Sequence, residues 1–360
     1  MAGKALWTEN FRPRPGECVA SIAVRLAPHG RLTPAELVRF GLKFARTPLA
    51  VVPTSIDSIG RLARLAGLQT AELAAAAWIK TPGGYRILGR EVPVAWVETS
   101  RRRVAPGVLA RDGGEPFVRT LWQIAALACD PESGEALRSR CWKCAHALTW
   151  QTANAICECP CGADQRAAPA RRVPQDVLVA AREIAGLFGH GPKPKVPAPF
   201  DKLPDPALFR LLGWFGYFSD LREGAQLRPS ETNAAKGYGA LKRWPASFDE
   251  VVVATLRDHV ERAEAASHSL RTRTMGRLMV VIGRAGSPAA ITILRERAER
   301  VLGVSCDVNP VLQRIYGPPH REEYKRTAPQ IRQPCFSSTG ASVAMRPSHD
   351  RIKSRARWSS

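Results

Sequence analysis

The sequence predicts a mainly α-helical protein with one small cysteine-rich ribbon, a helix-turn-helix-like N-terminal domain and a helical C-terminal domain. Three observations support this fold class. Apolar residues recur at helical spacing in several segments. Five of the nine cysteines fall within residues 141–161. A Pro- and Gly-rich stretch over residues 189–206 separates the two halves. Apolar residues form 45% of the 360-residue chain, enough for two or three domains with real cores.

The N-terminal domain, residues 1–100, is predicted to begin with two helices. Apolar residues at helical spacing over 18–27 predict the first. Thr33, Pro34 and Glu36 mark the start of the second. Thr is a good N-cap, Pro fits the first helical position, and Glu three residues after the cap completes a capping box.

Two further predicted helices give the outline of a helix-turn-helix unit. The first spans residues 57–66 and is ended by Gly67, and the second begins at Thr70 and ends near Trp78. The second helix is rich in Ala and poor in residues that read bases, so a structural or protein-binding role is an alternative to DNA contact. Alternating apolar residues over 85–97, with glycines at turn positions, predict a short hairpin.

The cysteine spacing predicts a metal site. Cys141 and Cys144 form a Cys-x-x-Cys pair, and Cys159 and Cys161 form a Cys-x-Cys-Gly pair. Two such pairs on short turns are typical of a tetrahedral four-cysteine zinc site, and Cys157 is an alternative ligand. Unliganded thiols or a disulfide are the other interpretation. Because four protein ligands leave no open position, the zinc is expected to be structural rather than catalytic.

The patterns divide the rest of the chain into a zinc-ribbon region (101–170), a connecting helix (171–188), a linker (189–206), a helical domain (207–317) and a basic tail (318–360). The tail is rich in Ser, Arg and Pro and poor in apolar residues, so it is predicted to be disordered. Apolar spacing and cap residues predict four helices in the helical domain, over 206–219, from near Ser230 to before Pro245, over 248–267, and from Ser287 to Gly303.

The charge balance indicates a polyanionic partner. Lys and Arg outnumber Asp and Glu by 53 to 32, a formal net charge of +21. Nucleic acid is the first candidate, and an anionic membrane surface is the second, although no long basic amphipathic helix stands out. The candidate phosphate contacts, each of which could instead lie on a solvated surface, are Arg101, Arg102, Arg103, Arg271, Arg273, Arg277 and Arg284.

The cellular location is expected to be the cytoplasm. The first residues lack the apolar core of a signal peptide, and no stretch approaches the length needed to span a bilayer. The cysteines are odd in number and clustered, which fits a reducing compartment better than a secreted disulfide framework.

The sequence does not predict an enzyme. No Gly-x-x-x-x-Gly-Lys-Ser/Thr phosphate loop is present. His259 and Glu261 form a His-x-Glu pair, but no Cys-x-x-Cys pair follows it, so the order found in zinc deaminases is absent.

Several motifs together resemble one family. The first, over residues 13–27, contains Pro-Arg-Pro-Gly-Glu, a Ser beside an apolar residue, and Arg-Leu-Ala. The second runs from Phe117 through Trp-Gln to Cys129, and the third is the cysteine motif over 141–164. A weaker echo lies over 241–248. In this combination the sequence resembles the TniQ family (also known through TnsD-type proteins), target-site selectors of cut-and-paste transposons.

The resemblance implies a non-catalytic adaptor. Members of the family bind a chromosomal DNA site or a guide ribonucleoprotein, and they recruit an AAA+ ATPase regulator, which in turn brings the transposase. A homodimer would suit such a selector. Two alternatives are a zinc-ribbon DNA-binding regulator of transcription and a domesticated TniQ relative that acts as a protein-binding scaffold.

One departure from the family pattern affects the expected metal content. The family usually carries an earlier zinc finger, but here its first ligand pair aligns with Ala105 and Val108, and its second with Cys129 and Glu132. Three of four ligands are lost, and one thiolate cannot hold zinc. The resemblance therefore implies one zinc ion per chain.

Overall fold

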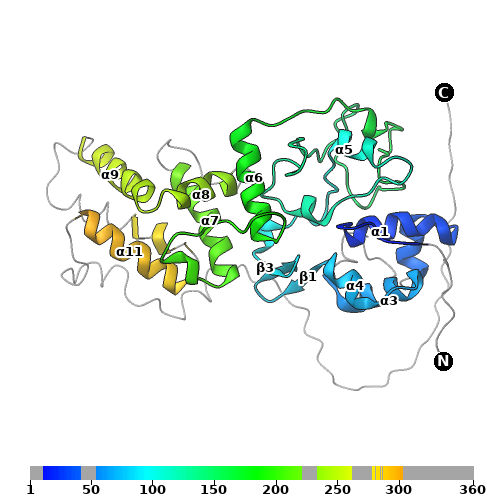
Figure 1. The fold of residues 1–360 in the computed structure, drawn as a ribbon, viewed down its shortest axis with the longest axis horizontal. Helices are drawn as coiled ribbons and strands as arrows, with labels where there is room; N and C mark the ends of the chain where they lie inside the picture. The colour runs from blue at the N-terminus through cyan, green and yellow to red at the C-terminus, as the bar shows by residue number, and fades with distance from the viewer. Residues whose placement is uncertain are drawn as a thin grey trace, which may run out of the picture. The chain divides into compact units, whose positions relative to one another are not determined.

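The computed structural model describes residues 11–41, 54–220, 233–261, 278–279, 281–283, 285 and 287–302 (Figure 1). The chain divides into two compact units, Met1–Val308 and Asn309–Ser360. The second unit and the predicted tail lie outside the described residues. Among the helices that are described, none is both long and apolar enough to cross a membrane.

The predicted N-terminal helices are present. Every residue of α1 (Val19–Leu26) except Arg25 is buried. The Thr33 hydroxyl accepts the Glu36 amide at 3.2 Å, and the Glu36 carboxylate accepts the Thr33 amide at 2.8 Å. This capping box opens α2 (Pro34–Glu36), and a π-helical turn over Leu37–Gly41 continues it.

The next two helices match the prediction except at their end. α3 (Ile56–Ala66) ends at Gly67, which has a φ of 68°, and α4 (Thr70–Ala75) packs against it after a short turn. The prediction of a helix up to Trp78 is wrong, because Trp78 opens strand β1 (Trp78–Thr81). This aromatic and β-branched segment pairs with a second strand, and that pairing overrides the helical pattern.

The small sheet is an antiparallel meander of β1, β2 (Gly84–Ile87) and β3 (Arg90–Val92). Tyr85 of β2 pairs with Val92 of β3, so the predicted hairpin is present, and β1 adds a third strand. Its predicted end at residue 97 is wrong, because β3 ends at Val92 and Val94–Trp96 form a 3-10 helix. Gly84 has a φ of 155°, and a Cβ added there would lie 1.9 Å from the Val92 carbonyl oxygen. Only glycine fits this close approach of two strands.

Residues 100–167 contain little regular structure apart from α5 (Pro106–Arg111) and short 3-10 helices (Figure 1). Single antiparallel bridges hold this region together. Residues 101–104, which we call the extended segment, lie between two partners, with one end bridged to Thr149 and the other to Arg138.

The predicted connecting helix and part of the predicted linker are described. The connecting helix is α6 (Gln175–Leu187). Within the Pro-rich stretch, Phe200 is fully buried, and its ring centroid lies 4.8 Å from that of Trp244 and 6.0 Å from that of Phe215. This part of the stretch therefore packs against the C-terminal helices.

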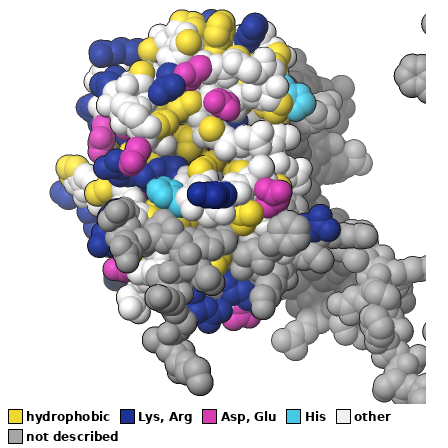
Figure 2. Space-filling model, turned by 90° about the vertical axis from the view of Figure 1, so that its right-hand side faces the viewer, with side chains coloured by type: hydrophobic (Ala, Val, Ile, Leu, Met, Phe, Trp, Pro, Cys, Tyr) yellow, Lys and Arg dark blue, Asp and Glu magenta, His cyan; other side chains and the backbone are white. Residues whose placement is uncertain are grey.

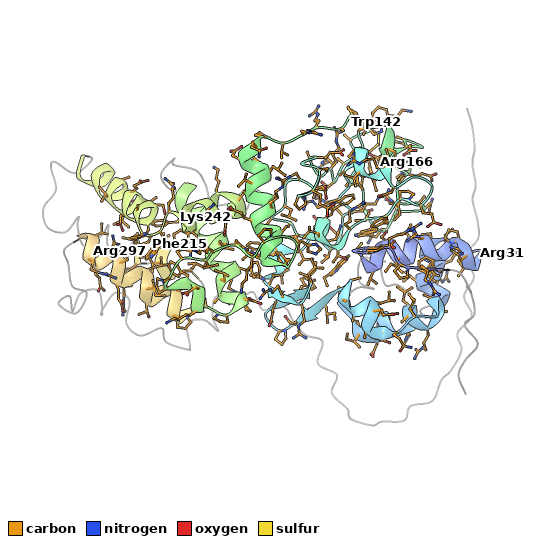
Figure 3. The ribbon with its side chains drawn as sticks, viewed as in Figure 1. Arg31, Trp142, Arg166, Phe215, Lys242 and Arg297 are labelled. Atoms are coloured by element: carbon orange, nitrogen blue, oxygen red, sulfur yellow. The ribbon has the colours of Figure 1, made fainter. Side chains whose placement is uncertain are left out.

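The C-terminal helices are α7 (Asp205–Asp220), α8 (Asn233–Lys242), α9 (Ala246–Glu261) and α11 (Pro288–Leu302). Their core is aromatic, because Phe218 stacks on Trp214 and on Phe248 with ring centroids 4.6 and 5.1 Å apart. Arg297 of α11 pairs with Asp249 of α9, at an Nε–Oδ1 distance of 2.8 Å (Figure 3).

The predicted start of the last helix is confirmed, because the Ser287 hydroxyl accepts the Ala290 amide at 3.1 Å. Ser230, Gly303 and the predicted helical residues after Glu261 lie outside the described residues.

Helices α7 and α8 approach each other closely at Gly237. A Cβ added there would lie 1.9 Å from the Leu212 carbonyl oxygen and 2.7 Å from the Gly216 nitrogen. We expect Gly237→Ala to lower the free energy of unfolding by about 1–3 kcal/mol, because the two backbones must separate. Chemical denaturation measures this change.

Gly239→Ala in the same helix is the matched control. Nothing lies within 4 Å of its added Cβ, and the position is exposed. Its free energy of unfolding should stay the same or rise by up to about 1 kcal/mol, since Ala is the better helix former. Equal stabilities of the two variants would contradict the close packing of α7 and α8.

Candidate metal centre

Two tight turns present the predicted ligands within residues 138–167, which we call the cysteine ribbon. In the first turn, the Cys141 amide donates to the His146 carbonyl at 2.8 Å. In the second, the Gly162 amide donates to the Cys159 carbonyl at 2.8 Å. Gly162 has a φ of 79°, a left-handed conformation that glycine adopts at little cost.

The turns bring four sulfur atoms together. The Sγ atoms of Cys141, Cys144, Cys159 and Cys161 all lie within 4.8 Å of one another. The Cys141–Cys161 distance is 3.8 Å and the Cys144–Cys159 distance is 3.6 Å. A tetrahedral ion with metal–sulfur bonds of about 2.3 Å separates its ligands by about 3.8 Å. The four thiols therefore fit one metal ion, and a site filled by four protein ligands has no position open for a substrate.

Cys141 is prepared for metal binding by its neighbours. Its Sγ accepts hydrogen bonds at 3.4 Å from the Lys143 amide and from the Gln165 side chain. Burial opposes ionisation of this thiol, but these bonds and one from the Cys144 amide lower its pKa to about 6. Burial raises the pKa of the neighbouring ligand Cys159 to about 12, so in the metal-free site the thiolate, the form that binds metal, is favoured at Cys141.

The structure distinguishes between Cys157 and Cys159 as the third ligand. Cys159 belongs to the four-sulfur group, whereas Cys157 is buried outside it. Burial also raises the pKa of Cys157 to about 12. His146 is exposed and is not part of the group.

Trp142 connects the two turns. Its indole Nε1 donates to the Asp164 carbonyl at 2.9 Å, and the Asp164 carboxylate pairs with Arg166, at an Nη2–Oδ2 distance of 2.7 Å (Figure 3). Trp142 is nevertheless 43% exposed. The outer face of the first turn therefore carries an aromatic ring that is fixed in place and open to solvent.

The predicted phosphate contact is wrong for Arg102. Its side chain is fully buried, and its Nη1 donates to the Ala155 carbonyl at 2.6 Å while its Nη2 donates to the Glu158 carbonyl. The guanidinium braces the cysteine ribbon from inside and cannot reach a phosphate on the surface.

Arg103 is also buried, and the prediction fails for it in the same way. Its Nη1 donates to the Ile124 carbonyl at 2.7 Å and the Trp122 carbonyl at 3.2 Å, and its Nη2 donates to the Leu127 carbonyl. Side chains alternate along extended backbone, so these two neighbours point to opposite sides.

The other predicted phosphate contacts remain predictions. Arg101 is half-buried. Arg271, Arg273, Arg277 and Arg284 lie outside the described residues.

A buried carboxylate lies beside the segment that the resemblance aligns with the first ligand pair of an upstream finger. Glu135 is buried, and its two oxygens accept the Gly107 amide at 2.7 Å and the Val108 amide at 3.2 Å. Burial raises the pKa of Cys129 to about 11. Within the described part of the chain, the four-cysteine group is the only cluster of three or more Cys, His, Asp or Glu side chains placed to share an ion.

The opening motif contains a buried ionic network that sequence reasoning did not identify. Glu17 is 1% exposed and accepts hydrogen bonds from the Ser21 hydroxyl at 2.8 Å, the Arg14 amide at 3.0 Å and the Arg25 guanidinium at 2.5 Å. Ser21 in turn accepts the Val118 amide at 3.1 Å. The Gly-Glu pair of this motif was the only feature of the sequence that could have pointed to the network. Through Glu17 and Ser21, the network joins α1 to the segment near residue 118.

We expect Cys144→Ser to remove the metal ion from the purified full chain, because three thiolates hold a divalent ion poorly. Elemental analysis of protein purified under reducing conditions should find about one ion per wild-type chain and about none in the variant. The variant should also unfold at a lower temperature, since metal binding contributes folding free energy.

Cys157→Ser is the matched control, because it removes a buried thiol of the same ribbon that lies outside the four-sulfur group. It should keep its full metal content. Loss of metal from Cys157→Ser with retention in Cys144→Ser would reverse the ligand assignment, and two ions in the wild type would refute the loss of the upstream finger.

The comparison with protein families agrees with the motifs. The TniQ family model matches residues 10–133, about a third of the chain. The match includes α1 to α5 and the extended segment, and it ends before Cys141. No curated protein matches the chain. The resemblance found in the sequence is therefore confirmed by a match to the TniQ family model over residues 10–133.

Proposed function

We propose that this protein is a non-catalytic adaptor that selects target sites for a transposition system. It binds DNA, directly or through a guide ribonucleoprotein, and recruits an AAA+ ATPase regulator and through it the transposase. The observation that carries this proposal is the TniQ domain over residues 10–133. The net charge of +21 supports a nucleic-acid partner.

The metal centre supports an adaptor role. We propose that its ion is zinc, since four thiolates at tetrahedral spacing are typical of structural zinc sites. In that role the ion holds the two turns of the cysteine ribbon together and takes no part in chemistry. The ribbon can then present a rigid outer surface to a partner.

The outer surface of the ribbon offers a candidate nucleic-acid contact. Arg140 and Lys143 are exposed on either side of Trp142, and the sequence holds no acidic residue between Glu135 and Glu158. Cations beside an exposed aromatic ring suit phosphates and bases. On the face shown in Figure 2, by contrast, Asp and Glu side chains are interspersed among Lys and Arg, which favours a local contact over a continuous basic surface.

We expect DNA binding with a steep salt dependence. The association constant should fall at least tenfold between about 50 and 200 mM salt, because each neutralised phosphate releases counterions. Reversing Arg140 and Lys143 together to Glu should weaken binding to all sequences and reduce the salt slope by about 2. Fluorescence anisotropy with labelled DNA measures both quantities.

Reversing Lys80 and Arg86 to Glu is the matched control. Both side chains are exposed on the small sheet, and the change in net charge is the same. An equal loss of affinity in the two double variants would show that only net charge matters. Reversal of Arg273 and Arg277 tests the remaining predicted contacts in the same assay.

The adaptor role requires a partner ATPase. We expect the gene to lie beside genes for an AAA+ ATPase and a transposase within terminal inverted repeats, and the purified ATPase to bind this protein with little dependence on salt. A gene without such neighbours, encoding a protein that still binds DNA, would favour a transcription regulator. A protein that binds no nucleic acid would favour a scaffold.

A further inference from the structure

Arg102 is a buried cation in an unusual position. It is fully buried in the extended segment, where its amide donates to the Leu148 carbonyl at 2.8 Å. Its guanidinium bonds to the carbonyls of Ala155 and Glu158, and its Nε has no hydrogen-bond partner. Among the described residues, no carboxylate forms an ion pair with it.

Such a charge is costly unless another charge compensates it. Carbonyl oxygens satisfy hydrogen bonds but carry no net charge, so they replace only part of the lost hydration. Burial lowers the pKa of Arg102 to about 10, so the group is still a cation at neutral pH. The structure must therefore supply negative charge nearby.

The cysteine ribbon is the place where negative charge would arise. Arg102 reaches the Glu158 carbonyl, which lies in the chain between Cys157 and the ligand Cys159. Burial lowers the pKa of Arg102, and the nearby groups that oppose this fall are Cys157, Cys159, the Glu158 carboxylate and Cys141, all of them in the cysteine ribbon. A divalent ion held by four thiolates has a net charge of about −2, which is opposite in sign to the guanidinium.

We propose that Arg102 is the buried counter-charge of the metal–tetrathiolate centre and positions the turn that carries Cys159. Metal loading and the packing of the extended segment then depend on each other. The proposal rests on the metal assignment but not on nucleic-acid binding. The proposed interaction joins two parts of the chain, since Arg102 lies inside the family match over residues 10–133 and all four ligands lie outside it.

Arg103 provides a matched control within the same segment. It is buried like Arg102, but its donors go to the carbonyls of Trp122, Ile124 and Leu127, away from the cysteine ribbon. Loss of either arginine should lower the melting temperature. Only loss of Arg102 should change metal affinity.

The test measures metal affinity in the full chain with Zn²⁺ and a chromophoric chelator under reducing conditions. We expect Arg102→Met to raise the Kd for Zn²⁺ by about 10- to 100-fold, as loss of a neighbouring contact does at other metal sites. Arg102→Lys should recover part of this loss, since Lys keeps the charge but not the two-carbonyl geometry. Arg103→Met should keep the wild-type Kd. The Co²⁺ absorption spectrum should remain that of four sulfur ligands in all three variants.

A second measurement separates charge compensation from general support of the fold. The rise in melting temperature on adding Zn²⁺ should be smaller for Arg102→Met than for wild type, because affinity and stabilisation are linked. In the metal-free chain, Arg102→Met should be closer to wild-type stability than in the loaded chain, since an uncompensated cation has then been removed.

Three results would overturn the inference. One is a wild-type Kd in Arg102→Met, and another is an equal loss of affinity in Arg103→Met. The third is an Arg102→Lys variant that binds no better than Arg102→Met, which would leave the positive charge without a role. A wild-type chain that binds no Zn²⁺ would instead refute the metal assignment itself.

Discussion

Two adjacent arginines in one extended segment connect most of the irregular part of this protein. Because Arg102 and Arg103 point to opposite sides, five carbonyl groups from two distant stretches of chain converge on residues 101–104. Helices and strands satisfy their own backbone groups, but loops do not. Here the guanidinium groups donate the hydrogen bonds that helices or strands would otherwise give these carbonyls. The loops can therefore form a buried core.

Local signals in the sequence predicted the elements with clear chemistry. The capping box at Thr33, the glycine stop at Gly67 and the four clustered cysteines appear in the structure at the predicted residues. Each depends on residues within a few positions of one another, so the sequence contains the whole interaction. Trp78 was misassigned because its strand forms through pairing with another segment.

The errors at the candidate site have a common physical cause. From sequence alone, a run of three arginines predicts a charged surface. Only the folded structure shows that backbone carbonyls surround two of the three side chains. Those carbonyls belong to residues 19 to 56 positions away in the chain. Every residue has a backbone carbonyl, so the side-chain sequence does not reveal which carbonyls will accept these hydrogen bonds. The same limit applies to Phe200, whose aromatic partners come from helices later in the chain. Burial of a charge or of a linker residue is a property of the assembled fold.

The extended segment also affects the order in which the protein can fold during synthesis. Its backbone pairs with Arg138 and Thr149, which leave the ribosome after the residues of the family match, 10–133, have been made. Until then Arg102 lacks both of its carbonyl partners, whereas those of Arg103 are already present. The backbone pairing of the extended segment therefore runs past the end of the family match at residue 133. The extended segment completes its contacts only once the cysteine ribbon has been made, and a fragment cut at residue 133 would keep both arginines but lose the carbonyl partners of Arg102.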